Sequence, residues 1–329
     1  MIYKKSISII IPNYNGRNLL EEYLPYTFEA ISKAGVKFEL IIVDDCSTDD
    51  SVAFIKSAYP EVKLLINEAN RGFSYSCNQG ITISENELIL LLNSDVKLSP
   101  DYFEPQWKYF AESDTFGVMG RIIDMEGDRI QDAARIPKFH GFKIKTEFYY
   151  TLDPENKNYS FYLSGANALI DAKKLKQIGG FNELFSPFYG EDLELSLRAW
   201  RLGWKCYYEH QSVCRHKASA STNNYKTPQW VKRIYYRNRF FVHAIHLSGV
   251  SLVFWILQIT FIDLFPRLLA GNLWMWNSYN DLLSNIKEIK KSKRELRTQM
   301  MSRGKEITLL NIVKIINDSL KGKEVIRLN

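Results

Sequence analysis

Short apolar runs alternate with amphipathic stretches through the first hundred residues. Four runs consist almost entirely of Ile, Leu and Val, at residues 7–11, 39–43, 62–66 and 88–92. Runs of this length and composition predict buried strands. Helices are predicted between them, at 19–34, after Thr48 and at 73–83. This alternation predicts an α/β fold with a doubly wound, mostly parallel sheet, because both faces of its strands must be covered.

Beyond residue 95 the pattern changes. A helix at 100–111 and a strand at 117–123 are followed by a less regular stretch, 124–160, with an aromatic and basic centre. Long irregular segments in compact domains are usually functional loops. We therefore expect a loop or lid there, with a surface insertion as the alternative. Regular structure returns in a strand at 165–170, a short helix ending at 178, a helix at 190–203 and strands at 205–208 and 212–216.

The last third has a different character. Residues 230–247 predict a helix, and 247–265 form a strongly apolar run that contains Gln258 and Asp263. Both flanks of the run are basic, at 226–239 and 287–305, and two polar side chains within it would cost insertion energy. These features favour a helical hairpin or an amphipathic helix lying in the membrane interface, with Trp255, Trp274 and Trp276 at headgroup depth. A protein or homodimer interface and a true membrane span remain the alternatives.

Composition and charge narrow the possible partners and the cellular location of the protein. The chain has 329 residues, 46% of them hydrophobic, and a net charge of +6, so it can bury a core and attract an anionic partner. Acidic and basic residues are mixed through the first two thirds, which argues against nucleic acid as a partner. The four cysteines lack CxxC spacing and are expected to be reduced thiols. Without an apolar signal sequence, we expect a cytoplasmic enzyme, peripheral at the inner face of the cell membrane.

Polar residues follow two of the predicted strands directly. Asp44 and Asp45 end the second strand, and Asn93, Ser94 and Asp95 end the fourth. In an open α/β sheet, ligands bind at the carboxyl ends of the strands. A carboxylate there can bind a hard divalent cation, which in turn binds phosphate oxygens. The pattern therefore predicts a metal–diphosphate site at Asp95.

Six motifs in order carry a resemblance to a known family. They are SIIIPNYNG at 8–16, VDDCSTDDS at 43–51, NRGFSYSCNQGI at 70–81, LLLNSDV at 90–96, SGANALI at 164–170 and GGFNELFSPFYGEDLELSLRAWRLGW at 179–204. Together they resemble the inverting family 2 glycosyltransferases with a GT-A fold, most closely the rhamnosyltransferase-type branch. The resemblance implies a Rossmann-like nucleotide-sugar-binding half at 1–98, an acceptor-binding and catalytic half at 99–222, and a helical C-terminal region at 223–329.

The resemblance also implies a set of nucleotide contacts. The Asp pair would bind a uracil or thymine base and the ribose, Tyr14 would stack on the nucleoside, and Arg71 would bind the diphosphate or the base. Helix capping by the Asp pair and a surface position for Arg71 are the structural alternatives. The complete expected set is Pro12, Asn13, Tyr14, Asp44, Asp45, Arg71, Asn78, Asn93 and Ser94.

For the metal, the resemblance places Asp95 at the last acidic position of the family's DXD motif. The motif here is Asn93-Ser94-Asp95, so one carboxylate is missing. His216 matches a family histidine that reaches back to the metal, and we expect it to complete a sparse Mn²⁺ or Mg²⁺ site. Such a site would bind metal weakly until the nucleotide sugar contributes its phosphates.

Asp192 is the expected catalytic base, with Glu191 beside it. An inverting transfer needs a carboxylate that removes the proton from the attacking hydroxyl, and a helix N-terminus favours the charged form. A simple helix cap is the alternative. The QxxRW motif of processive synthases is absent from the sequence, so we expect transfer of one sugar.

The predicted function is metal-dependent transfer from a UDP- or dTDP-sugar to a glycan or polyprenyl-diphosphate-linked acceptor in cell-surface polysaccharide biosynthesis. A degenerate GT-A scaffold that only binds nucleotide sugars is the alternative. A nucleotidyltransferase is disfavoured because the first strand lacks a glycine-rich phosphate loop. A dinucleotide oxidoreductase is disfavoured because no GxGxxG motif follows that strand.

Overall fold

The computed structural model describes residues 3–153, 155–217 and 227–328. Its centre is a ten-stranded sheet with strand order β10-β12-β6-β11-β4-β1-β2-β3, to which β5 and β7 add at the side. The strands of this sheet are β1 (Ile7–Asn13), β2 (Phe38–Asp44), β3 (Lys63–Ile66), β4 (Leu88–Leu92), β5 (Val96–Leu98), β6 (Thr115–Ile123), β7 (Ile130–Asp132), β10 (Asn158–Tyr159), β11 (Asn167–Asp171) and β12 (Lys205–His216). Strands β1 to β4 are parallel, whereas β11 runs antiparallel between β4 and β6.

Strands β1, β2 and β4 are largely buried on both faces, as their continuous composition predicts, whereas the edge strand β3 is not, because Lys63 and Ile66 are exposed. Ile10 of β1 packs into the core cluster that includes α3, α4 and α5, whereas Ile9 and Ile11 pack against α1 and α2 on the other face. The helices are α1 (Arg17–Ala34), α2 (Ser51–Ala58), α3 (Phe73–Ile83), α4 (Ala172–Gln177) and α5 (Glu191–Arg201). The prediction of a mostly parallel sheet of the GT-A kind is confirmed.

Two sequence predictions in the middle of the chain are wrong. Residues 100–111 form only a short 3₁₀ helix, η1 (Glu104–Tyr109), because Pro105 has no N–H to donate to an α-helical ladder. The stretch 124–160 is not an irregular loop, because it is built around a long β-hairpin. Its strands β8 (Ala134–His140) and β9 (Lys143–Tyr150) are joined at Gly141, whose φ of +63° suits a tight turn.

The hairpin forms a second sheet with the C-terminal strand β13 (Ile326–Leu328), which pairs with β9. The aromatic and basic residues that looked irregular therefore alternate between the two faces of a ribbon. The two predicted strands at 205–208 and 212–216 are one strand, β12, with a bulge between Glu209 and Val213. A bulge turns the strand locally, which explains the break in its pattern.

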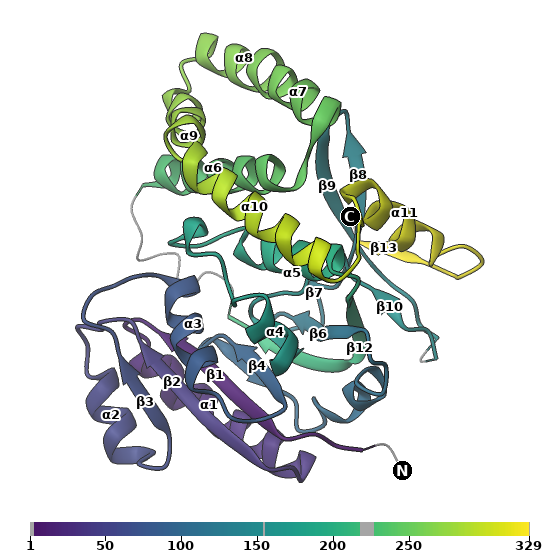
Figure 1. Cartoon of the computed structure of the whole chain (residues 1–329). Helices are drawn as coiled ribbons and strands as arrows, with labels where there is room; N and C mark the ends of the chain where they lie inside the picture. Colours follow the sequence, from purple (N-terminus) through teal and green to yellow (C-terminus); the bar gives the residue numbers. More distant parts are fainter. Residues whose placement is uncertain (1–2, 154, 218–226, 329) are drawn as a thin grey trace.

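The last third is helical, as predicted, and lies on the side of the molecule away from β1–β3 (Figure 1). Its helices are α6 (Pro228–His246), α7 (Gly249–Gln258), the π-helical segment η4 (Ile259–Leu264), α8 (Phe265–Leu269), α9 (Leu273–Ser284), α10 (Ile286–Ser302) and α11 (Leu309–Asp318). The predicted domain boundary at 222 and 223, and Lys226 of the first basic flank, lie outside the described residues. Within the described ranges, one helical stretch, Gly249–Leu269, is long and apolar enough to cross a membrane by length and composition.

Candidate active site

A cavity of about 420 Å³ opens at the carboxyl ends of β1 and β4. Loops from six parts of the chain line it, together with residues of α1 and α3, the first residues of α5 and the end of β12. Most of the predicted site residues meet there, namely Pro12, Asn13, Tyr14, Asp45, Asn93, Ser94, Asp95, Glu191, Asp192 and His216. The fold therefore brings residues as far apart in the chain as Pro12 and His216 into one cavity.

Asp45 lies in the cavity wall and also organises the loop before α3. Its Oδ1 accepts from the backbone N–H of Arg71 at 2.9 Å and from Asn67 Nδ2 at 2.8 Å, and its Oδ2 accepts from Gly72 N–H at 2.7 Å. Each carboxylate oxygen has two lone pairs, so Oδ2 keeps capacity for a further donor. Asp45 can therefore bind a ligand N–H or hydroxyl from a position that the protein has already set.

Asp44 does not line the cavity and supports it from behind. Its carboxylate is fully buried, accepting from Asn13 Nδ2 at 2.9 Å and from the Ser47 hydroxyl at 2.6 Å. These bonds join the end of β2 to the loop after β1. The second member of the Asp pair therefore fastens the two loops that hold Asn13 and Asp45.

Arg71 and Asn78 are also not brought to the cavity. The Arg71 guanidinium lies 4.6 Å from the centre of the Tyr75 ring. Both ends of the Asn78 amide bind the backbone of Phe181, through Nδ2 at 2.9 Å and Oδ1 at 2.8 Å. In this geometry, Asn78 connects α3 to the loop before α5 and does not line the cavity.

Asp95 and His216 face one another in the cavity, with Asp95 Oδ1 3.3 Å from His216 Nε2. They meet because β12 pairs antiparallel with β5, which places His216 opposite Val96. His216 Nδ1 lies 3.3 Å from Gln131 Oε1, a contact that requires the proton on Nδ1. The Nε2 lone pair is then directed at the carboxylate.

This pair fits a cation. Asp95 Oδ1 is buried and makes no hydrogen bond with any described residue, so a lone pair and an anionic oxygen face each other unless a positive charge lies between them. Burial lowers the pKa of His216, but the adjacent carboxylate of Asp95 outweighs burial and raises it, which favours a proton in that role. A divalent metal would fill it equally well.

Within the described ranges, no group of three or more His, Cys, Asp and Glu side chains surrounds one point. A metal here would therefore have only Asp95 and His216 as protein ligands of these types. The remaining positions would belong to water or to donor phosphates, consistent with the sparse site expected from the missing carboxylate of Asn93-Ser94-Asp95.

Glu191 and Asp192 begin α5 at the opposite part of the cavity lining. Gly190 precedes them with a φ of 83°, a left-handed conformation that turns the chain sharply into the helix. Glu191 is buried, and Asp192 is half-buried. Burial raises the pKa of Asp192 although the nearby positive charge of Arg135 lowers it, and burial together with the Asp192 charge raises the pKa of Glu191 further. Asp192 is therefore the carboxyl of the pair that ionises first.

Arg135 is a residue that the sequence interpretation missed. It projects inward from β8, is buried, forms an ion pair with Asp132, and lies 3.9 Å from the centre of the Tyr162 ring. Its charge favours the ionised form of Asp192. The local pattern did not single it out, because residues 134–137 of β8 are all buried and show no alternation between an inner and an outer face.

The loop that leads into α5 is held by a helix from the last third of the chain. Asn238 of α6 is fully buried, and its Nδ2 donates to the carbonyl oxygens of Phe185, Phe188 and Tyr189 at 2.7, 2.9 and 2.7 Å. Tyr189 has a φ of 74°, which non-glycine residues rarely adopt. The C-terminal region therefore holds the loop that positions Glu191 and Asp192.

A mostly parallel sheet, a carboxylate–histidine pair at its strand ends and an acidic helix start across one cavity define a GT-A glycosyltransferase. The chain belongs to the family described as Glycosyl transferase family 2, whose pattern matches residues 8–179.

Curated relatives agree with this family. An uncharacterized glycosyltransferase of Haemophilus influenzae is 25% identical over 240 residues, covering 70% of this chain and 88% of that protein. The putative teichuronic acid biosynthesis glycosyltransferase TuaG of Bacillus subtilis is 24% identical over 231 residues, covering 68% of this chain and 84% of TuaG.

Solved structures agree on the fold. S. aureus TarS in complex with UDP-GlcNAc has a TM-score of 0.55 at 16% identity, over 97% of this chain and 92% of that structure. The mannosyltransferase PcManGT of Pyrobaculum calidifontis, in complex with GDP-Man and Mn²⁺, has a TM-score of 0.52 at 16% identity, over 98% and 89%. These similarities extend into the C-terminal helices, which are thus part of a fold that other glycosyltransferases share.

Proposed function

We propose that the protein moves one sugar from a pyrimidine-nucleotide sugar to a hydroxyl of a glycan or lipid-linked acceptor, with inversion at the anomeric carbon. The acceptor would belong to cell-surface polysaccharide biosynthesis, the process named for the relative TuaG. Within family 2, the motif resemblance favours the rhamnosyltransferase-type branch and so a UDP- or dTDP-linked donor.

The observation that carries the proposal is that Asp95 and His216 share one cavity with Asp192 and Glu191. The first pair suits the phosphates of a donor with its cation. The second suits the acceptor hydroxyl. A cavity that holds a diphosphate-directed pair and a half-buried carboxylate can accommodate a leaving group and an attacking hydroxyl at the same time.

Each residue then has a defined task. Tyr14 is partly exposed at the cavity and can stack on the base, while Asp45 can accept a hydrogen bond from base or ribose. Asp192 removes the proton from the acceptor hydroxyl as that oxygen attacks. Glu191 precedes it in the same helical turn, and burial together with the charge of Asp192 raises the pKa of Glu191.

Asp95 and His216 would hold a divalent cation, Mn²⁺ or Mg²⁺. When bound, such a cation neutralises the negative charge that develops on the departing diphosphate. Gln131 orients His216 through Nδ1, which leaves Nε2 free to act as a ligand.

Replacing Asp192 with Asn tests the proposal. The variant keeps the size of the side chain and removes its basicity, so transfer should be lost while the donor still stabilises the protein against heat. If the protein were a non-catalytic scaffold, the wild-type protein would bind the donor but would show no transfer. Unchanged transfer in the variant would remove Asp192 from the mechanism.

The donor is identified by a thermal-shift panel of UDP-, dTDP- and GDP-sugars, including dTDP-rhamnose, each with and without Mn²⁺ or Mg²⁺. We expect stabilisation by a UDP- or dTDP-sugar that depends on the metal. Stabilisation by GDP-mannose alone would contradict the pyrimidine donor, and it is a real alternative because PcManGT binds GDP-Man.

A further inference from the structure

The helical stretch Gly249–Leu269 has two faces that repeat every four residues. Trp255, Ile259 and Asp263 point inward and are buried, so the prediction that Trp255 lies at headgroup depth is wrong. The opposite side exposes an apolar stripe, which consists of Val253, Leu257, Phe261, Phe265 and Leu269. A regular α-helix would rotate such a spacing out of line, but the π-helical turn η4 at Ile259–Leu264 widens the helix and keeps both sides aligned.

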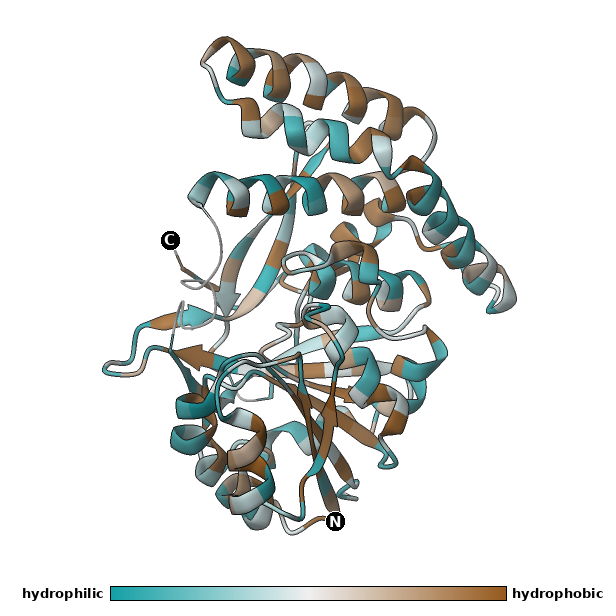
Figure 2. Ribbon diagram, turned by 90° about the vertical axis from the view of Figure 1, so that its left-hand side faces the viewer, coloured by the Kyte–Doolittle hydropathy of each residue, from teal (hydrophilic) through white to brown (hydrophobic). Residues whose placement is uncertain are grey.

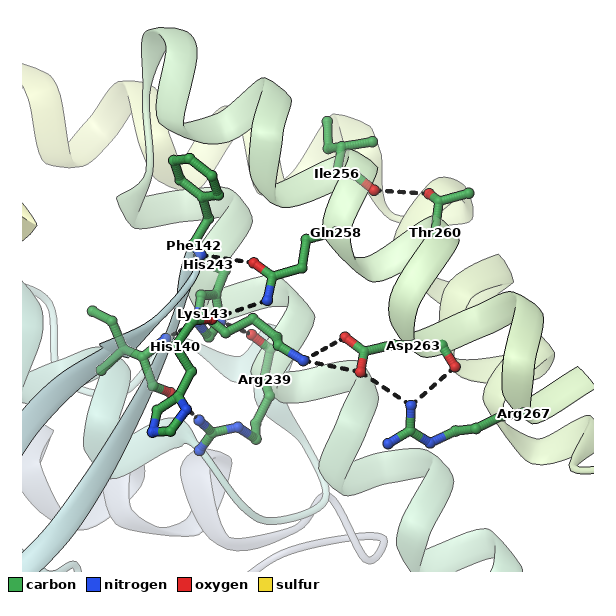
Figure 3. A network of polar contacts seen from close by, with 11 residues as sticks. His140, Phe142, Lys143, Arg239, His243, Ile256, Gln258, Thr260, Asp263 and Arg267 are labelled. Carbon is green, nitrogen blue, oxygen red and sulfur yellow. Dashed lines mark hydrogen bonds and ion pairs between the residues drawn. The ribbon is translucent and has the colours of Figure 1, made fainter.

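The inward face is fastened to the tip of the β8–β9 hairpin by polar contacts (Figure 3). Gln258 accepts from Phe142 N–H at 2.7 Å and donates to the carbonyl of His140 at 2.9 Å. Asp263 accepts from Lys143 Nζ at 2.9 and 2.7 Å and from Arg267 Nη1 at 3.0 Å.

Gln258 and Asp263, the two polar residues that interrupt the apolar run, therefore make contacts within the protein. Neither of them lies on the exposed stripe. A membrane span would have to break these contacts or carry the hairpin tip into hydrocarbon, which is costly. A helix that lies flat keeps all of them, and this favours the interfacial position over a span.

A second cavity, of about 330 Å³, lies beneath this helix, between the hairpin and α6. Its charged lining consists of Lys143, Lys145, Arg239, Arg267 and the single carboxylate of Asp263. His243 adds no charge, because burial lowers its pKa to about 4, and its ring accepts from Ile144 N–H at 2.9 Å. Four cations against one anion make the cavity suitable for a phosphate or diphosphate group.

The basic cavity adjoins the active site. Tyr235 lines the basic cavity, and its ring packs edge to face against Tyr189 with centroids 6.0 Å apart. Tyr189 lines the active-site cavity, two residues before Glu191. A bound group could therefore extend from one cavity to the other past these two rings.

The charge of this region agrees with a membrane surface. Beyond residue 222, Lys and Arg outnumber Asp and Glu more than twofold, whereas acidic residues are in excess before it. The cationic charge thus lies on the part of the chain that carries the apolar stripe, where Figure 2 shows the brown helix at the edge farthest from the N-terminal strands. Basic residues beside an apolar helix face are the combination that binds anionic lipid.

We propose that α7–α8 lies in the membrane interface with its apolar stripe in the lipid, and that the basic cavity beneath it binds the diphosphate of a polyprenyl-linked acceptor. The acceptor's sugar would then reach Asp192 past Tyr235 and Tyr189. The membrane part stands on the geometry of the helix alone, whereas the acceptor part rests on the proposed glycosyltransferase function.

The membrane part is tested by flotation of the full chain with phosphatidylcholine vesicles, with and without phosphatidylglycerol. Wild-type protein should float with the anionic vesicles. The double variant Leu257→Ser, Phe261→Ser should lose binding by more than about tenfold, because two large apolar side chains would no longer be buried in the lipid. Leu310→Ser on α11, which is 65% exposed, is the matched control and should bind like wild type.

Absence of wild-type binding would overturn the membrane part. So would a wild-type dimer that the double variant converts to a monomer, because the stripe would then be an interface between two copies. These measurements use no donor and no acceptor, so their failure is distinct from failure of the proposed function.

The cavity is tested with Lys145→Gln, which removes an exposed cation, and with Lys173→Gln on α4 as the control. Polyprenyl diphosphate in phosphatidylcholine vesicles should increase wild-type binding, and Lys145→Gln should weaken that increase several-fold while leaving the donor-induced thermal shift unchanged. Inorganic pyrophosphate separates a lipid-borne ligand from a free one. The assignment to a lipid-borne diphosphate would be overturned if free pyrophosphate bound as strongly as polyprenyl diphosphate. It would also be overturned if Lys145→Gln showed the same increase in vesicle binding as the wild-type protein.

Discussion

Asn238 offers the sharpest test of how the C-terminal region supports the active site. It lies on α6, far along the chain from Asp192, yet its amide is the donor to three carbonyls of the loop that leads into α5. Replacing it with Ala removes that donor from all three carbonyls, of which the contact to Phe185 is buried and those to Phe188 and Tyr189 are partly buried.

The expected magnitude follows from the contacts. One amide nitrogen has two hydrogens, so the three carbonyls share about two hydrogen bonds, each costing about 1–3 kcal/mol when a buried partner is orphaned. We expect Asn238→Ala to lower the free energy of unfolding by about 2–4 kcal/mol, a large part of a typical stability of about 5–15 kcal/mol. Loss of position at Asp192 should also lower kcat by about tenfold to a hundredfold.

Urea unfolding and steady-state transfer measure the two effects. Asn285→Ala is the matched control, because Asn285 also donates to one backbone carbonyl, that of Asp281 at 2.8 Å, but remote from the active site. The control should lose at most about 1 kcal/mol and keep its kcat. The link between α6 and the loop before α5 would be refuted if Asn238→Ala were as stable as the wild-type protein. It would also be refuted if the control lost as much kcat as Asn238→Ala.

Three further variants test the active-site cavity. Burial raises the pKa of Asp192 and the charge of Asp132 adds to this, so activity should fall on acidification at a higher pH than for an ordinary Asp. Asp132→Asn should move the acid limb of the pH–activity profile to lower pH. A shift of this limb to higher pH would contradict the assignment of Asp192 as the base. His216→Gln should weaken Mn²⁺ binding to the nucleotide-bound enzyme by more than about tenfold in calorimetry, whereas unchanged affinity would exclude His216 as a ligand. A Cβ at Gly165 would lie 3.2 Å from Phe73 and 3.9 Å from Asp192. Gly165→Val should therefore reduce turnover and the donor-induced thermal shift. Wild-type values for both would show that the residues around the cavity move to accommodate the larger side chain.

The local pattern of the sequence determined the elements of the nucleotide-binding half. The apolar runs at β1, β2 and β4 are buried on both faces because a strand without polar positions has no side to turn to water. The same pattern placed Asp45 and Asp95 at strand ends, and both line the cavity. Burial and strand direction are properties of a short segment, so a short segment was enough to predict them.

The pattern did not distinguish the two members of the Asp44–Asp45 pair. Alternate side chains of a strand and its extension point in different directions, and only the register of β1 against β2 decided that Asp44 faces Asn13 and Asp45 faces the cavity. The hairpin β8–β9 was missed for a related reason. Its alternation of charged and aromatic residues became meaningful only with the C-terminal strand β13 and α11 packed against it.

The tertiary structure alone decided the contacts between distant segments. Asp95 meets His216 through the pairing of β5 with β12, Asp192 gains the charge of Arg135 from β8, and its loop gains the amide of Asn238 from α6. Such contacts depend on how whole elements pack, and the energy that selects one packing is spread over many apolar side chains. The residue types of a site are therefore visible along the chain, but the partners that tune Asp192 and His216 are set by the packing of the fold.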